Sequence, residues 1–391
     1  MNERSLTSLS YGVMAIFAMI LTVTGPLLPA MSRSFELSMA EAGLLFTVNF
    51  SGFVAFILVG GVLADRLGKK RVISASLIGL TISLLLLPVA PSFAAACAAM
   101  FLIGGFGGVI ESQIGALIAA LNPARTSYYL NLSQVFFGVG ALVGPLGAGL
   151  LLAAGVDWRA VYLVLAGLTL ALTAVFVPLR APQLVSTDRI TWQAFRALLS
   201  DGRFLLICLC MMLYTGAEVG SWGWMSTFLS QSLGFSVVAS SAAVGVFWAA
   251  VTIGRFAVGQ LTLRYSAAAI IVALALASVV AVLLAAVVSE GAMVWVVIAA
   301  LGLAFSSQWP LIVAFGSERY PASSGTVFAL LVGSGGLGTT IIPLAMGTIG
   351  ESSGLRAAMA SPALAFLAIA AIIGVLAYRE RRAAVEAGAM A

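Results

Sequence analysis

Two acidic side chains, Glu111 and Glu218, stand inside long apolar stretches of this chain, and each belongs to a different half of it. Carboxyl groups in such surroundings are costly and are found where they work or are paired. Burial in a low-dielectric cavity favours the protonated carboxyl, which can gain or lose its proton when water reaches it. Because the chain has no histidine, these two residues are the predicted sites of proton coupling.

Other polar side chains share helical faces with these glutamates. Tyr214, Glu218 and Trp222 follow at intervals of four, which places a hydroxyl, a carboxylate and an indole on one face of a helix. Such groups suit a polyol, which offers many hydroxyls and a flat apolar side. The predicted substrate-binding residues are Glu111, Gln113, Asn131, Gln134, Tyr214, Glu218, Trp222, Asn49, Gln308 and Trp309.

Some of these residues also have a structural interpretation. Amides inside a membrane often bridge helices, and a tryptophan near the end of a span often anchors it at the interface. For Asn49 and Gln308 both roles stay open. Pro310 is expected to interrupt the stretch that contains Gln308 and Trp309 and to free backbone carbonyls there.

The composition is that of a membrane protein. The 391 residues are 62% hydrophobic and 8% charged, with a mean hydropathy of +1.13, whereas soluble domains carry about 25% charged residues. Stretches of about twenty apolar residues recur, and each is long enough to cross the hydrocarbon core. We predict an all-α polytopic protein with twelve transmembrane helices, at roughly 9–30, 42–64, 72–90, 94–120, 128–154, 159–178, 204–230, 238–263, 267–288, 292–316, 323–349 and 357–378.

The positions of Lys and Arg predict the orientation, because cytoplasmic loops hold the excess of these residues. With both termini in the cytoplasm, fifteen of the 19 lie on the inner side and only Arg33, Arg159 and Arg356 lie outside. This topology accounts for the net charge of +5 without a nucleic-acid partner. We therefore expect a monomeric protein of the bacterial inner membrane.

The two halves of the chain repeat each other. Residues 179–203 are the longest polar stretch, which we interpret as a cytoplasmic linker between six-helix bundles at 1–178 and 204–391. Two such bundles enclose a cavity near the middle of the bilayer and expose it alternately to each side, as in secondary transporters. A shift of 198 residues places Gly259 on Gly61, Leu261 on Leu63, Arg264 on Arg66 and Pro343 on Pro145.

The segment between the second and third spans, Gly61 to Arg71, reads GVLADRLGKKR. It resembles the signature loop of the major facilitator superfamily, which implies that fold of two pseudo-symmetric six-helix bundles. Small residues let two helix ends approach closely, and Asp65 can pair with a basic group or a helix end to latch one conformation. Asp65, Arg66 and Lys69 are therefore predicted gating residues. A plain topological role for the basic residues is the alternative.

A further gating role is predicted for Arg255, which lies within a span. It is expected to pair with Glu318 near the cytoplasmic rim, or to extend its charged end toward the interface.

Two shorter segments resemble one branch of this superfamily. NLSQVFFGVGA at 131–141 and YTGAEVGSW at 214–222 are similar to the fucose–galactose–glucose:proton symporters and their sugar-transporter-like relatives. The resemblance implies that Glu111, in the fourth span, serves both substrate and proton. Gly140-x-x-x-Gly144-Pro145 is also similar to a motif of drug:proton antiporters.

These observations favour a secondary transporter that takes up a sugar or a similar polar small molecule together with protons. An antiporter that exports drugs or metabolites is the first alternative, and a sensor with this fold that moves nothing is the second. No catalytic constellation or Walker-type loop is present, so we expect neither an enzyme nor a cofactor. Cys97, Cys208 and Cys210 lack metal-ligand spacing, so no metal site is expected.

Overall fold

The computed structural model describes residues 3–122, 126–179, 192–289, 291–320 and 324–389, and these residues are almost entirely helical. The described elements are α1 (Glu3–Phe35), α2 (Met39–Leu67), α3 (Lys69–Leu86), the 3-10 turn η1 (Leu87–Val89), α4 (Phe93–Leu121), α5 (Thr126–Ala153), α6 (Trp158–Phe176), α7 (Trp192–Leu199), α8 (Gly202–Leu233), α9 (Val237–Leu261), α10 (Ala267–Val287), α11 (Ala292–Phe305), α12 (Gln308–Arg319), α13 (Ser324–Ser353), α14 (Leu355–Ala360) and α15 (Pro362–Ala389).

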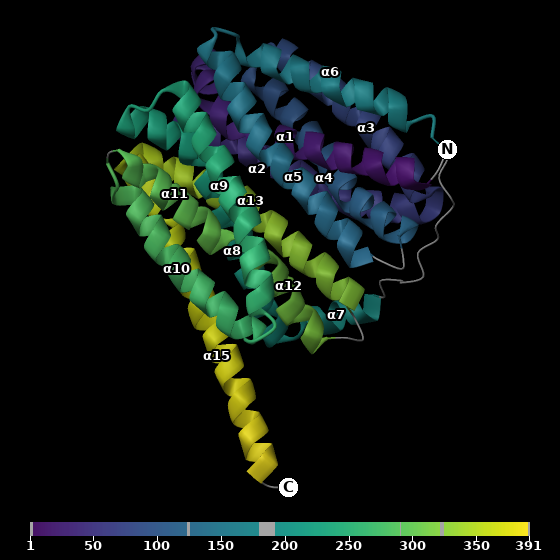
Figure 1. Ribbon diagram of the computed structural model, residues 1–391, viewed down its shortest axis with the longest axis vertical. Helices are drawn as coiled ribbons and strands as arrows, with labels where there is room; N and C mark the ends of the chain where they lie inside the picture. The colour runs from purple at the N-terminus through teal and green to yellow at the C-terminus, as the bar shows by residue number, and fades with distance from the viewer. Residues whose placement is uncertain (1–2, 123–125, 180–191, 290, 321–323, 390–391) are drawn as a thin grey trace.

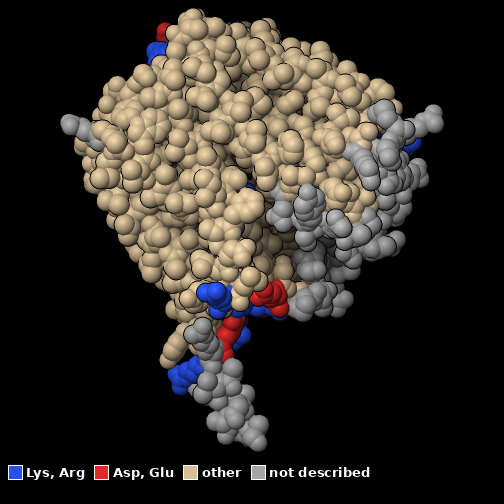
Figure 2. All heavy atoms as spheres, viewed as in Figure 1, with Lys and Arg blue, Asp and Glu red and all other residues tan. Residues whose placement is uncertain are grey.

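Twelve helical stretches in the described part of the chain are long and apolar enough to cross a membrane, which confirms the predicted number. The tenth is formed by α11 and α12 together, and the twelfth by α14 and α15. Figure 2 shows a broad surface with few charged side chains, and most of those visible are gathered near the lower end. The protein is an integral membrane protein.

One helix was not predicted. The eight residues of α7 lie inside the polar stretch that was interpreted as a linker. Most of the remaining linker, residues 180–191, lies outside the described residues. The helix is too short to span a membrane, so it leaves the number of crossings unchanged.

Short, capped connections fix the antiparallel order of neighbouring spans. The hydroxyl of Ser38 accepts a hydrogen bond from the amide of Glu41, and the Glu41 carboxylate accepts one from the amide of Ser38, which forms a capping box at the start of α2. α9 and α10 each begin with a simpler cap of one hydrogen bond. The hydroxyl of Ser236 accepts from the amide of Ala239, and that of Ser266 accepts from the amide of Ala269. These caps satisfy amide groups that a helix start leaves unpaired.

The helices form two bundles with the same internal pairing. In the first bundle α1 packs against α5, α2 against α4, and α3 against α6; in the second α8 packs against α13, α9 against α11, and α10 against α15. Each pair of the second bundle is the counterpart, six spans later, of a pair in the first. Figure 1 shows the two bundles side by side, the first in purple to blue and the second in teal to yellow.

Glycines allow the paired helices to approach closely. A Cβ atom on Gly104 of α4 would lie 1.8 Å from the carbonyl oxygen of Asn49, and one on Gly140 of α5 would lie 2.0 Å from that of Ala15. In the second bundle a Cβ on Gly338 would lie 1.8 Å from the Met212 carbonyl oxygen. Membrane helices associate through such close backbone contact because lipid supplies no hydrophobic driving force between them.

The two bundles contact each other mainly through α1 with α8, α2 with α13 and α5 with α9. The contacts lie toward the ends of these helices that are far from the linker. The hydroxyl of Thr47 on α2 donates a 2.6 Å hydrogen bond to the Thr340 carbonyl of α13. A Cβ on Gly25 of α1 would lie 3.0 Å from the carbonyl oxygen of Gly223 on α8. The bundles are thus closed together at the end opposite the linker.

Candidate functional site

The structure brings the two glutamates of the apolar stretches into one charged cluster. Glu111 lies on α4 of the first bundle and Glu218 on α8 of the second, and both are half-buried. Glu111 interacts electrostatically with Glu218 and with Arg255 of α9, and Arg255 also acts on Glu218. We call Glu111, Glu218 and Arg255 the charged cluster. It joins two carboxyls and one guanidinium from both bundles.

Arg255 connects the bundles directly. Its Nε donates a 3.0 Å hydrogen bond to the carbonyl oxygen of Ser306, and its Nη1 donates one of 3.3 Å to Oε1 of Gln134 on α5. The suggested ion pair with Glu318 is wrong, since the ion pairs among the described residues do not include it. The guanidinium is held by the free carbonyl of Ser306, whereas Glu318 is exposed near the end of α12.

Tyr214 contacts Glu218 from one turn earlier on α8. Its side chain is completely buried, and its hydroxyl oxygen lies 2.7 Å from Oε1 of Glu218 and 2.8 Å from the carbonyl oxygen of Phe305. The spacing of four residues on α8 places the hydroxyl beside the carboxyl, as the sequence predicted. Its hydroxyl is fully engaged, so a substrate would have to displace one of these bonds to contact it.

The tenth span is interrupted beside the charged cluster. α11 ends at Phe305 and α12 begins at Gln308, just before Pro310, which has no N–H to bond the carbonyl four residues earlier. The freed carbonyl of Ser306 is the one that accepts from Arg255. The predicted break and its free carbonyls are therefore confirmed, and they lie at the centre of the site.

The amides predicted to line the site mostly bridge helices. The Nδ2 of Asn49 donates to the Met100 carbonyl of α4 at 3.0 Å. Gln308 is completely buried and donates to the hydroxyl of Ser278 on α10 at 2.9 Å, which leaves its Oε1 without a partner. Gln113 is buried on α4 and donates to Ser112 at 3.3 Å.

The structure does not test substrate contact at two further predicted positions. The side chain of Asn131 lies outside the described residues. Trp309 is half-buried and packs edge-on against Phe328 of α13, with ring centres 6.2 Å apart. Substrate contact by either residue stays a prediction.

An aromatic layer lies beside the charged cluster, on the side toward the closed end. Trp222 of α8 contacts Phe46 of α2 with ring centres 6.1 Å apart, and Trp248 of α9 contacts Phe137 of α5 at 5.6 Å. The two tryptophans contact each other at 6.3 Å. We call Phe46, Phe137, Trp222 and Trp248 the aromatic layer. It connects the bundles between the charged cluster and the closed end.

Sequence reasoning missed three of the four members of the aromatic layer, Phe46, Phe137 and Trp248. Trp248 lies seven residues before Arg255, two turns away on the same face of α9, and that spacing was the available signal. Its indole Nε1 is buried without a hydrogen-bond partner, although a buried indole N–H usually has one. Trp248 therefore offers an unused donor.

The signature loop forms a tight connection between α2 and α3. Gly68 has a φ of 90°, a conformation that glycine adopts without strain. Arg66 is exposed and Lys69 is half-exposed, while the side chain of Asp65 lies outside the described residues. Lys70 was assigned only to topology, but it donates to the carbonyl of Val177 just after α6. The gating roles of Asp65, Arg66 and Lys69 stay predictions.

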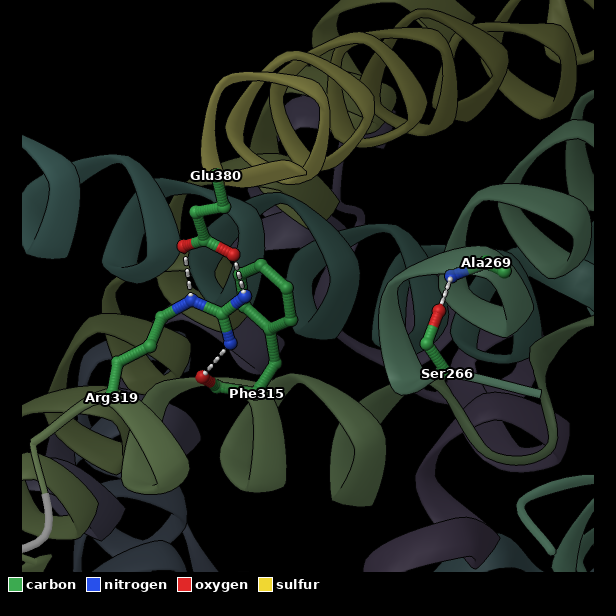
Figure 3. A network of polar contacts seen from close by, with 5 residues as sticks. All are labelled: Ser266, Ala269, Phe315, Arg319 and Glu380. Carbon is green, nitrogen blue, oxygen red and sulfur yellow. Dashed lines mark hydrogen bonds and ion pairs between the residues drawn. The ribbon is translucent and has the colours of Figure 1, made fainter. Parts of the chain in front are cut away.

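A second polar network, not predicted from the sequence, lies where α12 meets α15. Arg319 forms a bidentate pair with Glu380 at 2.7 and 2.5 Å, and it donates to the Phe315 carbonyl at 2.6 Å (Figure 3). Nearby, Tyr320 donates a 2.5 Å hydrogen bond to Asp201. This bond is the main cause that holds the pKa of Asp201 below its usual value. Burial, then the bond to Asp201, raises the pKa of Tyr320 to about 12.

Comparisons with known proteins agree with this architecture. A sequence profile of the Major Facilitator Superfamily matches residues 11–332. The protein TsgA homolog of Erwinia tasmaniensis is 24% identical over 357 residues, which covers 91% of this chain and 90% of that protein.

Solved structures share the fold at low sequence identity. A bacterial homolog of the human lysosomal transporter Spinster, in an inward-facing and occupied conformation, has a TM-score of 0.83 at 14% identity and covers 96% of this chain and 97% of that chain. The fucose:proton symporter FucP of E. coli, in the outward conformation, has a TM-score of 0.67 at 19% identity and covers 94% and 98%.

The profile extends over most of the chain, and the fold repeats its helix pairing after six spans. The segment from Gly61 to Arg71, which resembled the signature loop, connects the second and third spans, as the resemblance required. This chain belongs to the major facilitator superfamily.

Proposed function

We propose that this protein is a proton-coupled secondary transporter that takes up a sugar or a similar polar small molecule by alternating access. The observation that carries the proposal is the charged cluster, which joins one carboxyl from each bundle with a single guanidinium. Groups placed between two bundles change their surroundings when the bundles rock.

The charge balance of the cluster supports proton coupling. If both carboxyls were ionised, one negative charge would have no partner beside Arg255, and an uncompensated charge inside a membrane protein is costly. One proton on the cluster restores neutrality. Substrate binding and water entry change this cost, and they would thereby link proton movement to transport.

The neighbouring groups support a polar substrate with a flat face. The aromatic layer supplies ring surfaces, and the indole N–H of Trp248 supplies a free donor beside them. Carboxylate oxygens accept hydrogen bonds from hydroxyl groups. Symport of a sugar with protons is also the activity named for FucP, a fucose:proton symporter that shares the fold.

The orientation completes the proposal. With both termini in the cytoplasm of a bacterium, as the distribution of Lys and Arg indicates, the closed end faces outward and the structure is inward-facing. A solved relative with a TM-score of 0.83 is in an inward-facing conformation, which supports this part of the proposal.

Export of drugs or metabolites is the second candidate, and the aromatic layer is the observation that favours it, since rings also bind lipophilic compounds. The motif at Gly140 and Gly144 lends less support, because both glycines pack against α1. A Cβ on Gly144 would lie 2.8 Å from the Cα of Met19. Close helix packing alone accounts for this pattern.

Uptake into proteoliposomes tests the proposal. An inward proton gradient is expected to drive accumulation of labelled monosaccharides by the wild type. Glu111→Gln and Glu218→Gln each remove a titrating group, so both are expected to lose gradient-driven accumulation. A variant that still binds sugar is expected to keep exchange across the membrane without a gradient.

Glu318→Gln is the matched control, because Glu318 is exposed and lies outside the cluster. This variant is expected to accumulate sugar like the wild type. Efflux of lipophilic cations without any sugar uptake would favour the exporter. Unchanged accumulation in both cluster variants would contradict coupling at these carboxyls.

A further inference from the structure

The hydroxyl of Tyr214 has two partners and only one proton. Its oxygen lies 2.7 Å from Oε1 of Glu218 and 2.8 Å from the carbonyl oxygen of Phe305. A carbonyl oxygen only accepts hydrogen bonds, and so does an ionised carboxylate. The phenol therefore cannot donate to both partners while Glu218 is ionised.

Protonation of Glu218 resolves this conflict. A protonated carboxyl has one O–H donor, which it can donate to the phenol oxygen while Tyr214 donates to the Phe305 carbonyl. When Glu218 is ionised, the phenol donates to the carboxylate, because charge-assisted bonds are the stronger ones. The Phe305 carbonyl then loses its bond to Tyr214. One proton moves between water and Glu218, and only hydrogen bonds change.

The bond to Phe305 connects α8 with the break in the tenth span. Phe305 is the last residue of α11, and the next carbonyl, that of Ser306, is held by Arg255 of α9. The break is thus held by two neighbouring helices. The contact from Tyr214 depends directly on the proton of Glu218, because its hydroxyl bonds both the carboxyl and the Phe305 carbonyl.

The charged and titratable groups around Glu218 come from three helices. They are Tyr214 on its own helix, Arg255 on α9 and Glu111 on α4. Among the described residues, the other helices packed against α8 contribute no further charge that acts on Glu218. Arg255 and Glu111 therefore influence how easily the proton is held. Among the described residues, Tyr214 is the one whose hydroxyl bonds both the carboxyl and the broken span.

We propose that Tyr214 is a positioning residue that converts the protonation state of Glu218 into the presence or absence of a hydrogen bond between α8 and the break in the tenth span. The inference rests on the proposed proton coupling at Glu218. Beyond that coupling, it identifies the break in the tenth span as the part of the backbone that responds to the proton.

Infrared difference spectra of the purified protein between acidic and alkaline pH test the inference without a transport assay. The wild type is expected to show the C=O stretching band of a protonated carboxyl that is absent in Glu218→Gln. In Tyr214→Phe the band is expected to shift to higher frequency, because the carboxyl loses the phenol oxygen as its acceptor. Thr215→Val is the control and is expected to leave the band in place, since Thr215 bonds the Gly335 carbonyl instead.

Tyrosine labelled with ¹³C in its ring gives a second measure in the wild type, which stands even if Tyr214→Phe does not fold. One tyrosine C–O band is expected to shift as Glu218 titrates, and this shift is expected to vanish in Glu218→Gln. Two results would overturn the inference and leave proton coupling intact. One is an unchanged frequency of the carboxyl band in Tyr214→Phe, and the other is a tyrosine C–O band whose frequency does not change as Glu218 titrates. The absence of any titrating Glu218 band would overturn both.

Discussion

Polar residues inside this membrane protein differ in what they bond. Asn49 and Gln308 donate hydrogen bonds to neighbouring helices, so both amides bridge helices in this structure, and their contact with substrate stays a prediction. The two glutamates instead interact electrostatically with one guanidinium and with each other. The residue types alone predicted all four as candidates for the site. The structure adds the partner of each side chain, which shows that the two amides bridge helices and that the two carboxyls share a charged cluster. Such partners depend on the tertiary structure and cannot be read from the residue types.

At the residue scale, the bond between Tyr320 and Asp201 predicts a pH-dependent contribution to stability. The pKa of Asp201 is lowered from 3.8, mainly by this bond. A depressed carboxyl pKa stabilises the folded state above its unfolded value, and this stability is lost as the pH falls through the folded value. Tyr320→Phe is therefore expected to lower the stability at neutral pH by about 0.5–1 kcal/mol, a modest value because the pair is partly exposed to water.

Thermal unfolding of the purified protein, followed at neutral pH and below pH 3.8, measures this effect. The difference between Tyr320→Phe and the wild type is expected to shrink in acid, where Asp201 becomes protonated. Tyr265→Phe is the matched control, since Tyr265 is 59% exposed. A difference of the same size in acid would show that packing of the ring, and not the charged bond, stabilises this end of the molecule.

At the element scale, the spans were predictable because each needs about twenty apolar residues. Even the interruption of the tenth span followed from Pro310. The short α7 was missed because it lies in the stretch interpreted as a linker and its eight residues are fewer than a helical periodicity needs to be read, although six of them are apolar. The helix pairing was only partly predictable, because a glycine shows where backbones approach but not which helix approaches it.

The glycines of α5 test this packing. Gly140→Ala would place a Cβ 2.0 Å from the carbonyl oxygen of Ala15, so α1 and α5 would have to move apart. We expect a loss of stability of about 1–3 kcal/mol, as in overpacked cores. Gly147→Ala on the same helix meets no atom within 4 Å and is expected to be neutral or slightly stabilising, because alanine favours the helix.

Thermal unfolding of the two variants in one detergent gives the comparison. The midpoint of Gly140→Ala is expected to lie clearly below that of Gly147→Ala. Equal midpoints would mean that the contact between α1 and α5 yields easily. In that case the close approach of these helices would not limit stability.

At the scale of the whole molecule, the sequence predicted the architecture but not the conformation. The proposed alternating access requires two states of similar energy, so no local sequence pattern selects one of them. The repeated pairing of helices follows from the repeat in the sequence. The closed end, by contrast, is visible only in contacts such as that between Thr47 and Thr340.

Covalent closure of this end tests whether it must open. A Cβ on Gly43 of α2 would lie 3.2 Å from the Cα of Leu344 on α13, so cysteines at these two positions would be direct neighbours across the two bundles. The pair Gly43→Cys and Leu344→Cys, in a background without Cys97, Cys208 and Cys210, is expected to lock the end shut when oxidised. Transport is then expected to stop, and a reductant is expected to restore it.

Each single cysteine variant is the control and is expected to transport equally well before and after oxidation. The oxidised double variant is still expected to bind substrate from the open side, because the charged cluster and the aromatic layer lie below the closed end and do not include the bridged residues. Binding without transport would show that the disulfide blocks the exchange between states and not the site itself. Full transport by the oxidised protein would mean that substrate does not pass between α2 and α13, and alternating access through this end would have to be abandoned.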